Sequence, residues 1–144
     1  MTISSRFSVG IHILSLLEIN KAGINSSEMI ASSVNTNPVV IRKIMGKLKK
    51  AGLVTVNPGI AGAKLSRSLA EISLLDVYKA VEVVQDNELF SIHENPNPDC
   101  LVGKHLQEAI EPIFAMAQLA LEKVLQGITI EDVVESLQAR IITC

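Results

Sequence analysis

Aromatic side chains are rare in this 144-residue chain, which has no Trp, one Tyr and three Phe. Proteins that bind single-stranded nucleic acids stack the bases on aromatic side chains, so this composition argues against single-stranded RNA or DNA as a ligand. The hydrophobic content of 48% comes almost entirely from aliphatic residues. We therefore expect a core of packed helices and no extensive disorder.

Cysteine is also scarce, because the chain contains only Cys100 and Cys144, too few for a disulfide-based fold. The longest weakly charged apolar stretch, residues 109–121, includes a glutamate and a proline and falls short of the ~20 residues that cross a membrane. The beginning of the chain does not follow the charged-then-apolar pattern of a signal peptide. These observations predict a cytoplasmic protein.

Catalytic motifs are missing as well. A Cys/His pair could in principle serve a thiol-dependent hydrolase or transferase. However, the sequence shows no nucleophile motif, no phosphate-binding loop and no pair of catalytic carboxylates. We therefore predict that the protein is not an enzyme.

The chain does have a strong separation of charge. Up to Arg67, nine Lys and Arg residues accompany two acidic residues, a formal charge of +7. From Ser68 onward, four Lys and Arg residues accompany thirteen acidic residues, a formal charge of −9. A cationic N-terminal part on an anionic remainder is the pattern expected of a nucleic-acid-binding protein with a separate non-binding half. We therefore predict a DNA-binding lobe at residues 1–67 and a helical dimerisation or sensor lobe at residues 68–144.

Apolar spacing and capping residues predict three helices in the first lobe. The first spans residues 5–20, and the second spans residues 26–34 with Asn25 as its N-cap. The third begins at Asn37, which can cap it, and has Pro38 in its first turn. It ends before Gly52, and one of its faces is an apolar stripe while the other is basic. The stripe is Ile41, Ile44, Met45 and Leu48, and the basic residues are Arg42, Lys43, Lys47, Lys49 and Lys50.

Strands are expected at residues 53–56 and 64–66, joined by a glycine-bearing turn. The second lobe then has helices at residues 73–82, 102–125 and 129–139. Pro112 lies within the long helix and is expected to bend or break it.

Three helices followed by a two-stranded hairpin are the order of a winged helix-turn-helix. The predicted fold is therefore mainly α with a small β-wing and a long C-terminal dimerisation helix. In a winged helix the third helix enters the major groove, where Val39 and Val40 could pack on thymine methyl groups. Arg42 and Lys43 could reach a guanine edge or a phosphate. The alternative is a winged-helix protein–protein interaction module without sequence-specific DNA binding.

Three segments carry a family resemblance: MTISSRFSVGIHIL, NPVVIRKIMGKLKKAGLV and PGIAGAKLSRSLAEISLLDVYKAVE. They resemble the Rrf-type winged-helix transcriptional regulators of bacteria, a family that includes IscR, NsrR and CymR. The resemblance implies a homodimer joined along the long helix and bound to a two-fold operator in double-stranded DNA. A protein bound at a promoter blocks access to it, so a repressor is the favoured expectation. The predicted DNA-binding residues are Ser4, Ser5, Arg6, Ser26, Asn37, Pro38, Val39, Val40, Arg42, Lys43, Lys47, Gly59, Gly62 and Lys64. The predicted dimerisation residues are Leu106, Ile110, Ile113, Ala117, Leu121 and Val124.

The chain departs from the family pattern in three places. The wing usually reads Arg-Gly-x-x-Gly-Gly-Tyr, but residues 58–64 keep two glycines and lose the arginine, the third glycine and the tyrosine. Arg42 stands where IscR-like members often carry an acidic residue, so a different operator is expected. Cluster-binding members have three cysteines before the long helix, whereas only Cys100 lies there. An iron–sulfur cluster needs about four ligands, mostly thiolates, so none is predicted.

Cys100 is the candidate sensor. At the start of the long helix its thiol pKa would be lowered, which suits a redox-sensitive or small-molecule-sensing switch. The competing interpretation is a half-buried cysteine that packs as a small hydrophobic residue. The spacing of His93, Cys100 and His105 matches no compact zinc pattern, and His12 is interpreted as a structural or surface residue.

Overall fold

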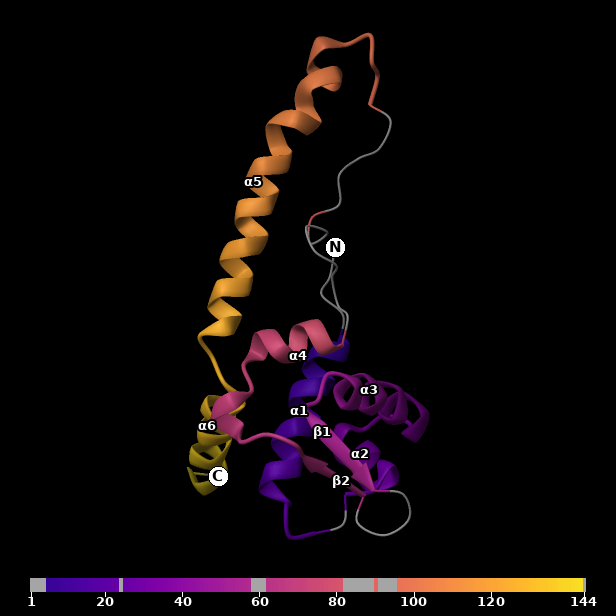
Figure 1. Ribbon diagram of the computed structural model, residues 1–144, viewed down its shortest axis with the longest axis vertical. Coiled ribbons are helices and arrows are strands. Elements are labelled where there is room, and N and C mark those ends of the chain that lie inside the picture. The colour runs from indigo at the N-terminus through magenta and orange to yellow at the C-terminus, as the bar shows by residue number, and fades with distance from the viewer. Residues whose placement is uncertain (1–4, 24, 58–61, 82–89, 91–95, 144) are drawn as a thin grey trace.

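The computed structural model describes residues 5–23, 25–57, 62–81, 90 and 96–143. Its N-terminal part contains helices α1 (Ser5–Ile19), α2 (Ser27–Val34) and α3 (Pro38–Lys50). Strands β1 (Val54–Asn57) and β2 (Gly62–Leu65) follow and pair antiparallel, with Val54 opposite Leu65. Figure 1 shows this hairpin beside α2 and α3, as in a winged helix. The predicted mainly helical fold with a small β-wing is confirmed.

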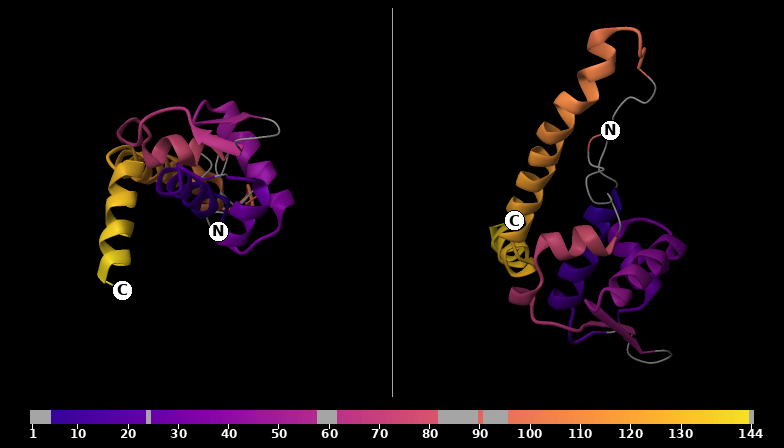
Figure 2. Two further views of the ribbon diagram at one scale, coloured as in Figure 1. Left: turned by 90° about the horizontal axis from the view of Figure 1, so that it is seen from below. Right: turned by 45° about the horizontal axis from the view of Figure 1, so that its top comes forward.

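The rest of the chain forms a 3-10 turn (Leu69–Glu71) and helices α4 (Leu74–Ala80), α5 (Leu101–Gln126) and α6 (Ile130–Thr143). Helix α5 extends away from the body of the molecule, and its C-terminal end returns to α4 and α6 (Figures 1 and 2). Among the described residues, no helix combines the length and apolar character needed to cross a bilayer. Helices α1 to α4, the hairpin and α6 form a body from which α5 projects.

One hydrophobic core joins the two ends of the chain. Side chains of α1, α3 and α4 pack together with Ile130 and Val134 of α6, all of them buried. The start of α6 is also fixed to the start of α4 by backbone hydrogen bonds, because Leu74 N–H donates to Ile128 O at 2.8 Å and Ile130 N–H donates to Ile72 O at 2.9 Å. Helix α6 is therefore anchored to the body by both apolar packing and backbone pairing.

Most of the predicted helix starts are confirmed. Asn37 caps α3, and Ser73 caps α4 in a reciprocal capping box. At the start of α6, Thr129 N–H donates to the Asp132 carboxylate at 2.9 Å and Asp132 N–H donates to the Thr129 hydroxyl at 3.2 Å. These interactions are local, since donor and acceptor lie three residues apart, so the sequence alone reveals them.

The predicted cap of α2 was wrong. Ser26, not Asn25, is the N-cap, and its hydroxyl accepts a hydrogen bond from Met29 N–H at 3.1 Å. Asn25 is instead buried and exchanges hydrogen bonds with Asn20, at 3.0 Å between the side chains and 3.2 Å to the Asn20 carbonyl.

Pro112 does not break α5, which continues through it.

Candidate nucleic-acid interface

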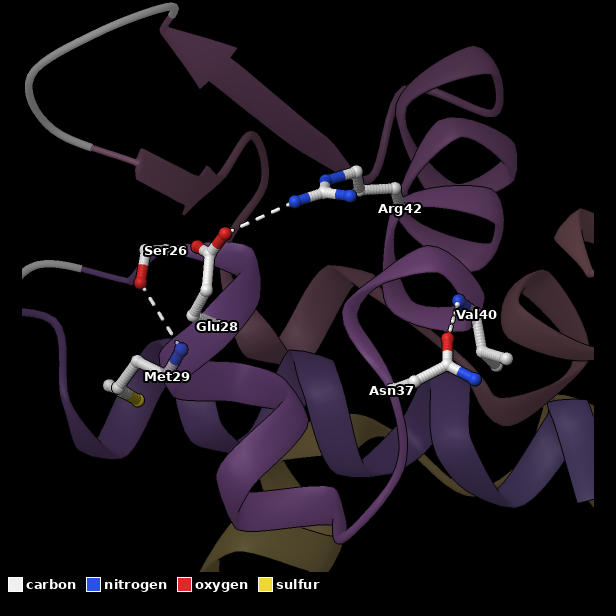
Figure 3. Close-up of polar contacts among 6 residues, drawn as sticks. All are labelled: Ser26, Glu28, Met29, Asn37, Val40 and Arg42. Carbon is white, nitrogen blue, oxygen red and sulfur yellow. Dashed lines mark hydrogen bonds and ion pairs between the residues drawn. The ribbon is translucent and has the colours of Figure 1, made fainter.

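The start of α3 is fixed by its own first residues. The side chain of Asn37 accepts a hydrogen bond from Val40 N–H at 3.0 Å, and Pro38 occupies the first helical position (Figure 3). Pro38 needs no hydrogen bond there, because the first N–H groups of a helix have no partner within it. Gly52, with φ of +78°, ends the helix region in the left-handed conformation that favours glycine. Both ends of α3 are thus held by residues that the sequence identified.

The two faces of α3 differ sharply. The apolar stripe predicted from the sequence is buried, with no member more than 8% exposed. The opposite face is open: Val39 is 65% exposed, Arg42 and Lys43 are exposed, and Lys47 is half-buried. Lys49 and Lys50 are exposed as well. The packing of α3 therefore turns one apolar side chain and most of its cations outward, where a ligand can reach them.

An ion pair links α2 to this open face. Arg42 Nη2 donates to Glu28 Oε1 at 3.1 Å, and both side chains are exposed. Figure 3 shows the pair bridging the two helices, with Ser26 at the start of α2 nearby. Sequence periodicity gave no sign of this contact, because the two residues belong to different helices.

The wing is attached to the segment before α2. Ala63 N–H donates to Asn25 O at 3.1 Å, and Asn25 forms a parallel bridge with Gly62. Gly62 has φ of +64°, and a Cβ built on it would lie 2.3 Å from Asn25 O. This position therefore requires glycine for packing within the protein, and contact of Gly62 with DNA stays a prediction. Lys64, opposite Thr55 in the hairpin, is exposed.

The remaining predicted DNA-binding residues are placed as follows. Ser5 is exposed and Arg6 half-buried, and both belong to the first turn of α1. Ser26 is half-buried because its hydroxyl caps α2. Ser4 and Gly59 lie outside the described residues.

The long helix α5 carries an extensive exposed apolar surface. Of the predicted dimerisation residues, Leu106 and Ile113 are 48% and 61% exposed, Ala117 is exposed, and Val124 is 61% exposed. Ile110 and Leu121 are half-buried. The sequence stripe omitted further exposed apolar side chains, namely Leu101, Val102, Met116 and Leu119, at 76%, 70%, 70% and 67%. The open apolar surface is therefore wider than the predicted stripe.

Cys100 is the N-cap residue of α5 and is exposed. Its thiol makes no capping hydrogen bond of ordinary geometry. Even so, the backbone N–H of Gly103, followed by that of Val102, lowers the pKa of Cys100 below the usual thiol value. In the single chain this thiol is therefore a surface group and does not pack in a core.

The donor set of the chain does not fit an iron–sulfur cluster. The sequence supplies two cysteines, whereas such clusters are held by about four ligands, mostly thiolates. In the described part of the chain, no group of three or more His, Cys, Asp or Glu side chains is placed to hold a metal ion. His105 Nδ1 lies 3.7 Å from Glu108 Oε2 on α5 itself, and His93 lies outside the described residues.

An open apolar groove of about 330 Å³ lies between α1 and α6. Its lining includes Ile11 and Leu16 of α1 and Leu137 and Ile141 of α6. His12 borders it, is exposed, and has its Nε2 atom 2.9 Å from Ser33 Oγ of α2. His12 is therefore a surface residue that links α1 to α2, in agreement with its interpretation from the sequence.

Known proteins similar to this chain are transcriptional regulators. The family model Rrf2, described as "Iron-dependent Transcriptional regulator", matches residues 3–136. A Bacillus subtilis (strain 168) protein named "Putative HTH-type transcriptional regulator YwnA" is 48% identical over 135 residues, which cover 94% of this chain and 98% of that protein. These names describe regulators, not enzymes, as the sequence predicted.

Two solved structures have the same fold. A crystal structure described as that of a "putative DNA binding protein" has a TM-score of 0.71 and 44% identity and covers 90% of this chain and 98% of that one. The structure of CymR (YrzC), the global cysteine regulator of B. subtilis, has a TM-score of 0.68, 21% identity and coverage of 94% and 98%. At that identity the likeness to CymR shows the fold alone. Because the family model matches nearly the whole length of this chain, the chain belongs to the Rrf2 family of transcriptional regulators.

Proposed function

We propose that this protein is a homodimeric repressor that binds a specific sequence in double-stranded DNA. The observation that carries the proposal is the open face of α3, where Val39, Arg42 and Lys43 are exposed directly opposite a fully packed apolar stripe. Residues 1–67 would provide DNA binding, and residues 68–144 dimerisation and signal reception. Residues 1–67 carry the formal charge of +7 that attracts a polyanion, and the remainder carries −9.

In this proposal the N-terminal half of α3 enters the major groove. Val39 packs on thymine methyl groups, while Arg42 and Lys43 reach base edges or the flanking phosphates. Lys47, one turn further along α3, and Lys64 on the wing would contact phosphates. The wing lacks the arginine of the usual family pattern, so α3 carries most of the sequence recognition.

The exposed apolar surface of α5 supports dimerisation. A soluble monomer rarely exposes a contiguous apolar patch larger than a few hundred Å². Here seven large apolar side chains along α5 are between 48% and 76% exposed. A second copy of the same helix would cover them and would place two α3 helices on a two-fold operator, about one helical turn of DNA (~34 Å) or a multiple of it apart.

The test is selection from a pool of random-sequence duplexes, followed by filter binding of the selected duplex over a range of salt concentrations. We expect a two-fold symmetric consensus, and an affinity whose logarithm falls linearly with the logarithm of salt concentration. A pool that yields no consensus would favour the interaction module without sequence-specific DNA binding. Repression is tested separately by transcription from a template in which the selected site overlaps the promoter.

A thiol switch at Cys100 is the second proposal, and the exposure and lowered pKa of this thiol favour it. Hydrogen peroxide would oxidise the thiolate to a sulfenic acid: an S–O bond forms, the O–O bond breaks, and the second oxygen leaves as hydroxide, which takes up a proton from solvent to give water. Cys100 begins α5, so its modification would act on the helix proposed to join two copies. Operator binding by the wild type and by Cys100→Ser is compared after mild peroxide treatment, and equal responses would exclude the switch.

A further inference from the structure

An ion pair connects Glu28 of α2 with Arg42 of α3. It joins two helices on the open face of the winged helix, with 3.1 Å between Arg42 Nη2 and Glu28 Oε1 (Figure 3). The side chains are 56% exposed for Arg42 and 69% exposed for Glu28. The carboxylate therefore lies in contact with the α3 side chain best suited to read a guanine.

Folding stability gives little reason for this pair. Ion pairs between exposed side chains contribute little, because water and salt screen them and two long side chains lose freedom. Glu28 lies in the first turn of α2, where its charge is favourable for the helix dipole with or without Arg42. Folding stability therefore does not account for the contact, which lies on the face proposed to meet DNA.

We propose that Glu28 is a positioning residue that directs Arg42 toward a base edge and away from the phosphate backbone. This inference rests on the proposed function, since it requires α3 to enter the major groove. It adds a determinant of specificity on α2, a helix that need not itself contact a base.

The chemistry of the guanidinium supports this role. Arg carries five N–H donors in a rigid plane, and Glu28 accepts from one of its terminal nitrogens. The other donors remain available for the two acceptors, O6 and N7, that guanine presents in the major groove. A lone guanidinium is attracted to any phosphate in reach, whereas the Glu28 carboxylate beside Arg42 offsets part of that sequence-independent attraction. Holding the side chain in one orientation also reduces the conformational freedom lost on binding.

Glu28→Gln is the informative variant, because it removes the charge and keeps the size of the side chain. Arg42 would then be free to contact a phosphate. We expect tighter binding to unrelated DNA and a salt dependence steeper by up to about 0.9 in log–log slope, the value for one added phosphate contact. The ratio of specific to non-specific affinity should fall by about tenfold, within the range by which a bidentate arginine discriminates bases.

Fluorescence anisotropy with two labelled probes measures both effects. One probe is a duplex that the wild-type protein selects from a random pool, and the other is a scrambled duplex of the same base composition. The proteins are wild type, Glu28→Gln, Arg42→Ala and the double variant. Glu18→Gln is the matched control, because Glu18 forms a comparable pair with Lys21 on α1, at 3.3 Å, and its loss changes net charge equally.

The inference is supported if Glu28→Gln lowers the affinity ratio and steepens the salt dependence while Glu18→Gln does neither, and if the effect disappears when Arg42 is alanine. It is overturned if Glu28→Gln behaves like Glu18→Gln, or if its effect persists in the Arg42→Ala background. A wild-type protein that does not distinguish the selected duplex from the scrambled one would instead overturn the proposed function, and this inference with it.

Discussion

The contact between Gly62 of the wing and Asn25 gives a quantitative prediction about stability. In Gly62→Ala, the new Cβ would lie 2.3 Å from Asn25 O and 2.6 Å from Asn25 C, and both are backbone atoms that cannot rotate away. The residue also has φ of +64°, where an L-residue costs about 1–2 kcal/mol. Forcing extra volume into a packed contact costs a further ~1–3 kcal/mol. We therefore expect the free energy of unfolding to fall by about 2–5 kcal/mol.

A loss of this size is a large part of the ~5–15 kcal/mol that stabilises a typical domain. Gly46→Ala is the matched control, because Gly46 lies in α3 and a Cβ added there would have no neighbouring atom within 4 Å. Alanine inside a helix is favoured over glycine by about 1 kcal/mol, so this variant should be slightly more stable than the wild type.

Urea unfolding followed by circular dichroism measures both variants. All proteins are compared at one concentration, since association with a second copy would add to the apparent stability. The midpoint should fall for Gly62→Ala and rise slightly for Gly46→Ala, with little change in the slope m. If Gly62→Ala unfolds at the wild-type midpoint, the close approach of the wing to Asn25 does not exist in solution.

Three further predictions concern the thiol, a helix cap and the long helix. The first is measured in a Cys144→Ser background, as the rate at which iodoacetamide alkylates Cys100 at different pH values. The midpoint of this rate should lie at a lower pH in the native protein than in urea, because the N–H groups of Gly103 and Val102 favour the thiolate. A native midpoint at or above that of the unfolded protein would contradict this. Asn37→Ala should lower the free energy of unfolding by about 1 kcal/mol, and Asn37→Ser should retain most of it, as measured in urea; equal losses would show that the cap does not contribute. Met116→Glu should leave the monomer folded, because this side chain is 70% exposed. It should weaken the proposed dimer at least tenfold, as measured by sedimentation equilibrium, because it would bury a charge between two α5 helices. An unchanged dimer would place the interface elsewhere.

The parts of the structure that the sequence predicted depend on local interactions. The caps at Asn37, Ser73 and Thr129 act over three residues, and the buried stripe of α3 repeats every three or four. Such patterns are visible in the chain because both partners lie within one turn of a helix.

The parts that the sequence did not reveal depend on partners from distant segments. Asn25 looked like a helix cap, but the backbone of Gly62 and the side chain of Asn20 hold it in a buried position. The pair of Glu28 with Arg42 joins two helices, and no periodicity connects them. The exposed apolar surface of α5 was only partly predicted, because which side of a helix the body covers is decided by tertiary packing and not by apolar spacing.

Mapping the position of α3 on DNA tests the central proposal most directly. A cysteine replaces Gly46, on the helix and in open space, in a Cys100→Ser, Cys144→Ser background, and carries an iron chelate that cleaves nearby DNA. A chelate at Lys104 of α5, which is exposed, is the control. On the selected duplex, we predict that the chelate on α3 cuts at two major-groove positions related by two-fold symmetry and separated by ~34–36 Å or a multiple of that distance. Cleavage no stronger than that from position 104, or confined to the minor groove, would contradict the insertion of α3 into the major groove.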